Sequence, residues 1–326
     1  MTNLAIIVPC YNEEEALKFT IPKLLELLKN LISKNLISSN SFLLFIDDGS
    51  DDNTWKEIIL ACCKEPIHIK GIRLAINCGH QSALLCGLNF SSENCDAAIS
   101  IDADLQNGLD AIPLMLDAFK NGAEIVVGVR TSRDTDTVLK RSLSNGFYGA
   151  MNLIGVDLVK NHADFRLLSK KALINLKLFP EKNIFLRGLS PKLHKKIEVV
   201  QYVCEKRIAG QSKYTYRKMI SLALNGITSL TVAPLRLIFL LGLIVFTISL
   251  MMIVFILISA ANGKALPGWA SIILPVYLLG GLIMLSIGIL GEYIGKVFIE
   301  SKNRPRYLID ELSPNTVKEG MTINVE

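Results

Sequence analysis

Two long stretches without a charged residue restrict the fold of this chain more than any other feature. They cover residues 237–262 and 265–291, and large aliphatic side chains dominate both. Each exceeds the roughly 20 apolar residues that a helix needs to cross the hydrocarbon core of a bilayer. Two buried helices of a large soluble core are the alternative. Two such stretches in succession favour a transmembrane helical hairpin near the C-terminus instead.

Basic residues beside the two stretches predict how the hairpin is oriented. They are Arg207, Lys213, Arg217, Lys218 and Arg236 before the first stretch, and Lys296, Lys302, Arg304 and Arg306 after the second. The short connector carries a single lysine, Lys264. Because Lys and Arg concentrate on the cytoplasmic side of a membrane, we expect both termini in the cytosol.

The region before the hairpin has the character of a cytosolic domain. The first residues, Met1-Thr2-Asn3, lead directly into a strand-like segment without the pattern of a signal peptide. All seven cysteines precede the first apolar stretch, and none shows the CxxC spacing of a metal site. An odd number of cysteines without that spacing fits free thiols in a reducing compartment.

Strand-like and helix-like segments alternate along this domain. Short apolar runs predict strands at 4–8, 41–46, 69–74, 97–101 and 124–129, and helical spacing of apolar residues predicts helices at 13–34, 51–63, 82–88 and 113–121. Asp51 and Asn53 are expected to cap the second helix. Such alternation predicts an α/β layer with a mainly parallel sheet.

Polar clusters follow three of the predicted strands. They are Tyr11-Asn12-Glu13-Glu14, Asp47-Asp48 and the group Asp102, Asp104 and Gln106. Ligands of parallel sheets bind beyond the carboxyl ends of the strands, so these clusters predict a site there. Surface turns and helix caps are the alternative explanation of the acids.

The acidic pair at Asp102 and Asp104 indicates the chemistry of that site. On a regular strand the two side chains would point the same way, because side-chain direction has period two. Two converging carboxylates suit Mg²⁺ or Mn²⁺, which would neutralise a diphosphate. The chain has neither a GxGxxG turn after its first strand nor a GxxxxGK[ST] loop, which disfavours dinucleotide-binding and P-loop folds.

Taken in order, the motifs resemble those of the family-two glycosyltransferases of GT-A fold. The early motifs are Val8-Pro9-Cys10-Tyr11-Asn12-Glu13-Glu14, Asp47-Asp48-Gly49-Ser50 and Asp102-Ala103-Asp104-Leu105-Gln106. The later ones are Gly128-Val129-Arg130-Thr131-Ser132-Arg133, Ala163-Asp164-Phe165-Arg166-Leu167, Phe185-Leu186-Arg187-Gly188 and Arg207-Ile208-Ala209-Gly210-Gln211-Ser212-Lys213-Tyr214. With the hairpin, these resemble the polyprenyl-phosphate group, which includes dolichol-phosphate mannose synthases and bactoprenol glycosyltransferases.

The resemblance implies roles for named residues. Nucleotide-sugar binding would fall to Pro9, Tyr11, Asn12, Glu13, Glu14, Asp47, Asp48, Asp102, Arg207 and Lys213. The metal, Mg²⁺ or Mn²⁺, would be held by Asp102, Asp104 and Gln106. The catalytic group would be Asp164 with Arg130 and Arg133, whose forked guanidinium groups suit the phosphate of a lipid acceptor.

Several side chains keep two interpretations. Asp164 is either a base or acceptor-orienting group, or a buried partner of Arg166. His80 and His162 are lone histidines, for which a hydrogen-bonding role is favoured over metal binding. Where the family usually continues its metal motif with Asp-Pro-Pro, this chain has Asn107-Gly108-Leu109, so the local turn is expected to differ.

The sequence therefore predicts five segments: a GT-A (Rossmann-like) catalytic domain over 1–213, a juxtamembrane amphipathic helix over 214–234, spans at 235–262 and 269–295, and a cytosolic tail over 296–326. The resemblance implies an inverting transferase of a bacterial inner membrane that moves glucose or N-acetylglucosamine from a UDP-linked donor to undecaprenyl phosphate. It implies no nucleic-acid partner, and a homo-oligomer is possible. The alternatives are a processive polysaccharide synthase, disfavoured by the missing Gln-x-x-Arg-Trp segment, and a non-catalytic membrane scaffold.

Overall fold

The structure is a computed structural model that describes residues 1–131, 162–181, 193–203 and 269–316, with isolated positions at 186, 189 and between 235 and 258. The chain divides into two compact units, Met1–Tyr216 with Pro305–Glu326, and Arg217–Arg304. The first unit holds the sheet and the candidate site. The expected juxtamembrane helix at 214–234 lies outside the described residues.

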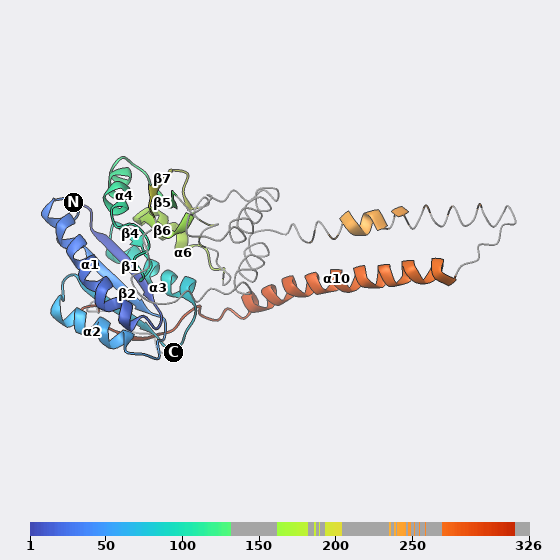
Figure 1. The fold of residues 1–326 in the computed structure, drawn as a ribbon, viewed down its shortest axis with the longest axis horizontal. Coiled ribbons are helices and arrows are strands. Elements are labelled where there is room, and N and C mark those ends of the chain that lie inside the picture. Colours follow the sequence, from blue (N-terminus) through green and yellow to red (C-terminus); the bar gives the residue numbers. More distant parts are fainter. Residues whose placement is uncertain are drawn as a thin grey trace. The chain divides into compact units, whose positions relative to one another are not determined.

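The first unit contains an eight-stranded sheet with helices on both faces (Figure 1). The strands are β1 (Leu4–Cys10), β2 (Phe42–Asp47), β3 (Ile69–Leu74), β4 (Ala97–Ser100), β5 (Ile125–Arg130), β6 (His162–Ser169), β7 (Ile197–Tyr202) and β8 (Ile309–Leu312). The helices of this unit are α1 (Glu14–Ser33), α2 (Thr54–Lys64), α3 (His80–Asn94), α4 (Ala111–Lys120) and α6 (Lys170–Lys177). The predicted α/β alternation is confirmed.

The strand order is β7-β5-β6-β4-β1-β2-β3-β8. Neighbours from β4 through β1 and β2 to β3 are parallel, as are β5 and β7. Strand β6 is antiparallel to both of its neighbours, and β8 is antiparallel to β3. The structure thus has the GT-A-like arrangement of a mostly parallel sheet that the motifs predicted.

Side chains on the two faces of the sheet form two hydrophobic clusters. Along β1, Leu4, Ile6 and Val8 pack with α1, α2 and α4, whereas Ala5 and Ile7 pack with α3 and α6. This alternation is the period-two pattern of a strand buried on both faces. The sheet is therefore a rigid layer, and its strand ends are held in fixed positions.

Helix α3 is longer than the predicted helix over 82–88. It begins at His80 and ends at Asn94, and its buried side chains include Ser91 and Ser92 as well as Leu84 and Leu88. A helix buried on several sides carries no simple amphipathic pattern. The prediction rested on the spacing of apolar residues and therefore missed both ends of α3.

The segment after the apolar stretches was expected to be a tail, and this prediction is wrong for residues 305–316. They belong to the sheet unit, and β8 pairs with β3. The Gly71 amide donates to Ser313 Oγ at 2.9 Å, and Asn315 Nδ2 donates to the Cys62 carbonyl at 3.1 Å. A four-residue strand that pairs at the sheet edge has too short a pattern to stand out in the sequence.

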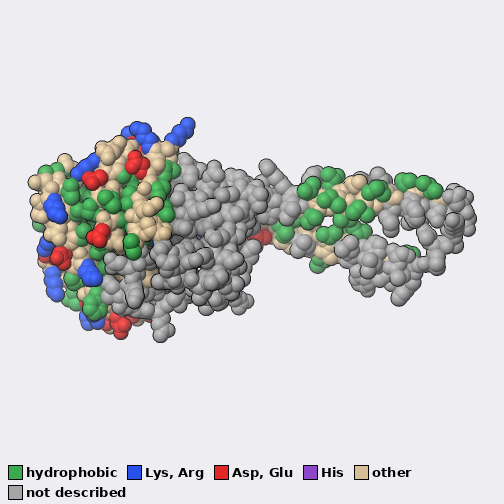
Figure 2. Space-filling model, turned by 45° about the horizontal axis from the view of Figure 1, so that its top comes forward, with side chains coloured by type: hydrophobic (Ala, Val, Ile, Leu, Met, Phe, Trp, Pro, Cys, Tyr) green, Lys and Arg blue, Asp and Glu red, His purple; other side chains and the backbone are tan. Residues whose placement is uncertain are grey.

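The second unit contains α10 (Trp269–Ser301). Within the described residues, one helical segment, Leu279–Ser301, is long and apolar enough to cross a membrane. Figure 2 shows hydrophobic side chains gathered over the described residues of this unit, while charged side chains are scattered over the visible face of the sheet unit. The hairpin and its orientation stay a prediction.

Candidate active site

Strands β4, β1 and β2 are neighbours, and the polar clusters that follow them come from adjacent points of one sheet edge. All three strands run in the same direction, so their carboxyl ends meet there. The Thr20 hydroxyl of α1 donates to the Ala103 carbonyl at 2.6 Å and ties the segment after β4 to the helix after β1. The predicted gathering of the clusters is confirmed by this topology.

Asp102 and Asp104 lie in a tight turn directly after β4, so the condition of a regular strand does not apply to them. Strand β4 ends at Ser100, and the Leu105 amide donates to the Asp102 carbonyl at 3.2 Å. Leu105 has φ +49° and is buried. A left-handed residue that is not glycine costs on the order of 1–3 kcal/mol, so the surrounding packing holds this turn in place.

The donor set of this turn fits a hard divalent cation. Asp102 and Asp104 supply carboxylate oxygens, and the backbone N–H of Gln106 donates to Asp104 Oδ1 at 3.2 Å. Among the described residues no group of three His, Cys, Asp or Glu side chains converges as a metal cage. Two carboxylates suit a cation that takes its other ligands from a bound diphosphate and water.

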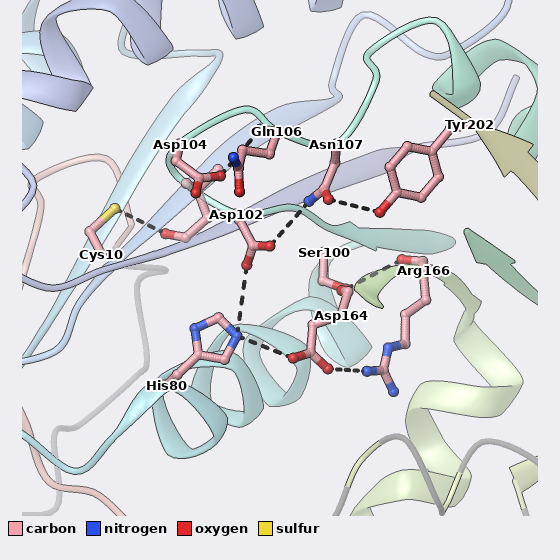
Figure 3. Close-up of polar contacts among 11 residues, drawn as sticks. Cys10, His80, Ser100, Asp102, Asp104, Gln106, Asn107, Asp164, Arg166 and Tyr202 are labelled. Carbon is pink, nitrogen blue, oxygen red and sulfur yellow. Dashed lines mark hydrogen bonds and ion pairs between the residues drawn. The ribbon is translucent and has the colours of Figure 1, made fainter. Parts of the chain in front are cut away.

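Asn107, where the chain departs from the usual family motif, is part of the site (Figure 3). It is fully buried, and its Nδ2 donates to Asp102 Oδ2 at 3.3 Å. The Tyr202 hydroxyl donates to Asn107 Oδ1 at 3.1 Å and accepts from Arg130 Nε at 3.1 Å. A chain of hydrogen bonds thus joins Arg130 to Asp102. Sequence reasoning noted Asn107 only as a departure from the family's metal motif, and it missed Tyr202, which stands in no motif with known chemistry.

Asp164 contacts Arg166 with one carboxylate oxygen and His80 with the other. Its Oδ1 pairs with Arg166 Nη2, and its Oδ2 lies 3.6 Å from His80 Nε2. Arg166 is buried, and its Nη1 donates to the Leu186 carbonyl at 2.9 Å. Arg166 therefore fixes one oxygen of Asp164, and the other faces the acidic turn through His80.

His80 lies between the two acidic groups. Its Nε2 is 3.9 Å from Asp102 Oδ1 as well as 3.6 Å from Asp164 Oδ2 (Figure 3). Burial raises the pKa of the Asp102 carboxyl, and the charge of Asp164 adds to this rise, whereas His80 lowers it. Sequence reasoning favoured a hydrogen-bonding role for His80 over metal binding and gave no sign of its two carboxylate neighbours.

Asp48 anchors the loop that leads to His80. Its two oxygens accept from the Cys78 amide at 2.8 Å and the Gly79 amide at 2.9 Å. Gly49 beside it has φ +64°, and a Cβ there would come within 2.6 Å of the Ile76 carbonyl carbon, so the turn needs glycine. Burial raises the pKa of Asp48, and the two amide bonds oppose that rise.

Asp47 is buried directly behind Asp48. Its Oδ1 accepts from the Ser50 amide at 3.2 Å, and its Oδ2 lies 3.6 Å from Arg73 Nε. Burial raises the pKa of Asp47, while the Ser50 hydrogen bonds and the Arg73 charge lower it. Asp47 therefore shapes the turn that presents Asp48.

Residues of the cluster after β1 form hydrogen bonds with the segment between β2 and α2. The backbone N–H of Asn12 donates to Ser50 Oγ at 2.9 Å, and Glu14 Oε2 accepts from Asn53 Nδ2 at 3.1 Å. Asn53 occupies the N-cap position of α2 without a side-chain cap bond, and Asp52 Oδ1 accepts from the Thr54 amide at 3.0 Å. The predicted capping by Asp51 and Asn53 is wrong, because Asp52 supplies that bond.

Of the remaining predicted site residues, three lie at or directly after the end of β1 and three lie outside the described residues. Pro9, Tyr11 and Glu13 lie at the end of β1 and directly after it, and the Glu13 amide donates to Thr54 Oγ1 at 2.9 Å. Arg133, Arg207 and Lys213 lie outside the described residues.

Fold and site together define a GT-A-like α/β protein with an acidic turn beyond its parallel strands. The profile described as "Glycosyl transferase family 2" matches residues 5–177. The uncharacterized glycosyltransferase YkoT of Bacillus subtilis is 46% identical over 307 residues, which cover 94% of this chain and 91% of the relative. The chain therefore belongs to glycosyl transferase family 2, as its motifs predicted.

Two further similarities complete the comparison. The bactoprenol glucosyl transferase of Shigella phage SfV is 36% identical over 308 residues, which cover 94% of this chain and 97% of the relative. The mannosyltransferase PcManGT from Pyrobaculum calidifontis, solved in complex with GDP-Man and Mn²⁺, is 16% identical with a TM-score of 0.46, covering 68% of this chain and 62% of that chain.

Proposed function

We propose that this chain is an inverting, metal-dependent glycosyltransferase that moves glucose from UDP-glucose to a polyprenyl phosphate. The observation that carries the proposal is the acidic turn of Asp102 and Asp104 at the ends of the parallel strands, beside Asp48 and Asp164. The identity with the phage bactoprenol glucosyl transferase over nearly the whole chain supports glucose as the sugar and a polyprenyl phosphate as the acceptor.

The donor half of the site lies at the ends of β1 and β2. There Asp48 and the cluster after Pro9 would bind the base and ribose, and Arg207 with Lys213 would bind the phosphates. A divalent cation held by Asp102, Asp104 and Gln106 would neutralise charge on the leaving diphosphate. The chain's own contribution is a rigid turn that holds these oxygens before the donor arrives.

The acceptor half lies on the side of β5 and β6. Arg130, placed by its bond to Tyr202, and Arg133 would hold the lipid phosphate, whose oxygen is already anionic near neutral pH. A strong base is then less necessary than alignment of two negatively charged partners. Asp164, fixed by Arg166, would orient the acceptor for displacement at the anomeric carbon, and a single displacement inverts that centre.

The membrane arrangement follows from the same proposal. A lipid acceptor requires the site to work at a bilayer surface, and we propose that residues 235–262 and 269–295 form a hairpin with both termini in the cytosol. The apolar character of Leu279–Ser301 and the basic residues outside both stretches support this.

The test uses the full chain in membranes with undecaprenyl phosphate and radiolabelled UDP-glucose, UDP-N-acetylglucosamine or GDP-mannose. We expect label to enter the lipid phase from UDP-glucose with Mg²⁺ or Mn²⁺, and none after chelation by EDTA. Asp104→Asn should remove transfer. Asp117→Asn, which changes an exposed aspartate of α4, is the matched control and should retain it.

Two results would count against the proposal. If label is transferred only from a donor other than UDP-glucose, the proposed sugar or the proposed nucleotide is wrong. Absence of transfer from every donor, in protein that binds nucleotide and metal, would point to another acceptor or to a scaffold. The anomeric configuration of the lipid product, read by NMR, should be opposite to that of the donor.

A further inference from the structure

Four residues form one row across the edge of the sheet that carries the donor half of the site. Cys10 of β1 is the register partner of Asp47 in β2, Asp47 is that of Arg73 in β3, and Arg73 is that of Glu311 in β8. Register partners on neighbouring strands have their side chains on the same face. The row therefore runs from beneath the predicted nucleotide cluster to the last strand of the sheet.

The charges along this row alternate in sign. Asp47 Oδ2 lies 3.6 Å from Arg73 Nε, and Arg73 Nη1 lies 3.9 Å from Glu311 Oε2. Exposure increases outward, from 0% for the Asp47 side chain to 34% for Arg73 and 54% for Glu311. The Trp55 indole donates to Glu311 Oε2 at 2.8 Å and so fixes the outer carboxylate.

Asp47 depends on Arg73 more than a surface acid would. Its Oδ2 is buried and makes no hydrogen bond to any of the residues that the structure describes. A buried carboxylate oxygen without a hydrogen bond is costly, and a nearby cation offsets part of that cost. The position of the Arg73 guanidinium therefore matters for the turn that presents Asp48.

Strand β8 is held firmly enough to set that position. The Ser313 amide donates to the Gly71 carbonyl at 2.9 Å, and the Thr316 hydroxyl donates to the same carbonyl at 3.2 Å. On the other side, Asn89 Nδ2 donates to the Tyr307 hydroxyl at 3.0 Å. These contacts fix the backbone of residues 307–316 on the sheet unit.

We propose that Glu311 is a positioning residue that holds Arg73 against Asp47, so that the strand after the predicted membrane helix shapes the donor site. The inference rests on the proposed function, because it takes the Asp47-Asp48 turn as part of the nucleotide pocket. It assigns the C-terminal segment a role in donor binding instead of that of a tail.

The test measures UDP binding and transfer kinetics in the full-length protein, comparing wild type with Glu311→Gln. Glutamine can still accept from the Trp55 indole but carries no charge for Arg73. Because exposed ion pairs contribute at most about 1 kcal/mol, we expect a loss of UDP affinity of about two- to fivefold, with KM for the donor raised alike and kcat unchanged. The matched control is Asp310→Asn, which removes the same charge from the same strand at an exposed position.

Arg73→Lys provides a second variant, because an ammonium group cannot span two carboxylates as a guanidinium does. It should weaken UDP binding in the same range, and combining it with Glu311→Gln should add little, since both break one row. Unchanged UDP affinity in Glu311→Gln would overturn the positioning role, and so would an equal loss of affinity in Asp310→Asn. A lower melting temperature of Glu311→Gln with an unaltered KM would also overturn it. Failure of the wild type to bind UDP would instead overturn the proposed donor.

Discussion

Asn107 donates a hydrogen bond to Asp102 at 3.3 Å from a fully buried position. The residue that departs from the family's usual motif is therefore the one that orients the first carboxylate of the acidic turn. Its other contact, to Tyr202, extends the connection to Arg130. Both halves of the proposed site are linked through this one amide.

Replacing Asn107 should weaken activity through Asp102. In Asn107→Ala the carboxylate loses a hydrogen bond, and bonds to charged groups contribute about 1.5–3 kcal/mol. We expect kcat/KM to fall about tenfold or more. The Mn²⁺ concentration that gives half-maximal transfer should also rise, which a titration of activity against Mn²⁺ measures. Asn121→Ala, at the exposed end of α4, should have wild-type activity. Equal metal curves for Asn107→Ala and wild type would contradict this role.

Replacing His80 should reduce turnover more than stability. The side chain is 39% exposed, so His80→Gln removes little packing, but it takes away the group between Asp102 and Asp164. We expect kcat to fall about fivefold with a melting temperature close to that of the wild type. His194→Gln, in the segment before β7, serves as the control, and a similar loss there would show that the effect is not specific to His80.

Substitutions of Asp164 and of Arg166 should differ in their effects on transfer activity and on melting temperature. Removing one partner of a buried ion pair leaves the other charge uncompensated and lowers the free energy of unfolding by about 3–5 kcal/mol. Arg166→Met should therefore lower the melting temperature strongly. Asp164→Asn retains an oxygen for Arg166 and should remove most of the transfer with a much smaller change in stability. Full activity of Asp164→Asn would leave only the structural interpretation, a partner of Arg166.

The Asp47–Arg73 pair should make stability depend on pH in a defined direction. The folded pKa of Asp47 is raised by burial, so this group destabilises the folded state as pH rises through that pKa. Arg73 limits the rise. In Arg73→Gln the pKa of Asp47 should rise further. The loss of melting temperature should be greatest at neutral to mildly alkaline pH and should shrink as the pH is lowered and Asp47 takes up its proton.

The control for this pH series is Lys29→Gln, which breaks the exposed pair between Lys29 and Glu65. Exposed pairs contribute little, so its melting temperature should stay near that of the wild type at every pH. A loss in Arg73→Gln that is the same at low and at neutral pH would mean that the loss does not arise from the interaction of Arg73 with the charged Asp47.

The sequence by itself determined the layer structure and the place where the candidate site lies. Continuous apolar runs specify strands buried on both faces, and the acids that follow them must meet at one edge, since parallel neighbours end together. The position of Asp48, Asp102 and Asp104 beyond the carboxyl ends of the strands could therefore be predicted from pattern alone. The apolar stretches likewise predicted a membrane segment, because their length and lack of charge are local properties.

Only the tertiary structure decided which side chains contact one another across the sheet. The hydrogen bond between Tyr202 and Asn107 and the charged contacts of His80 and of Glu311 join residues that are far apart in sequence or lie outside any motif. Strand β8 is too short to carry a pattern of its own, and its place depends on the unpaired edge of β3. Local patterns encode elements, whereas contacts between distant elements follow from packing.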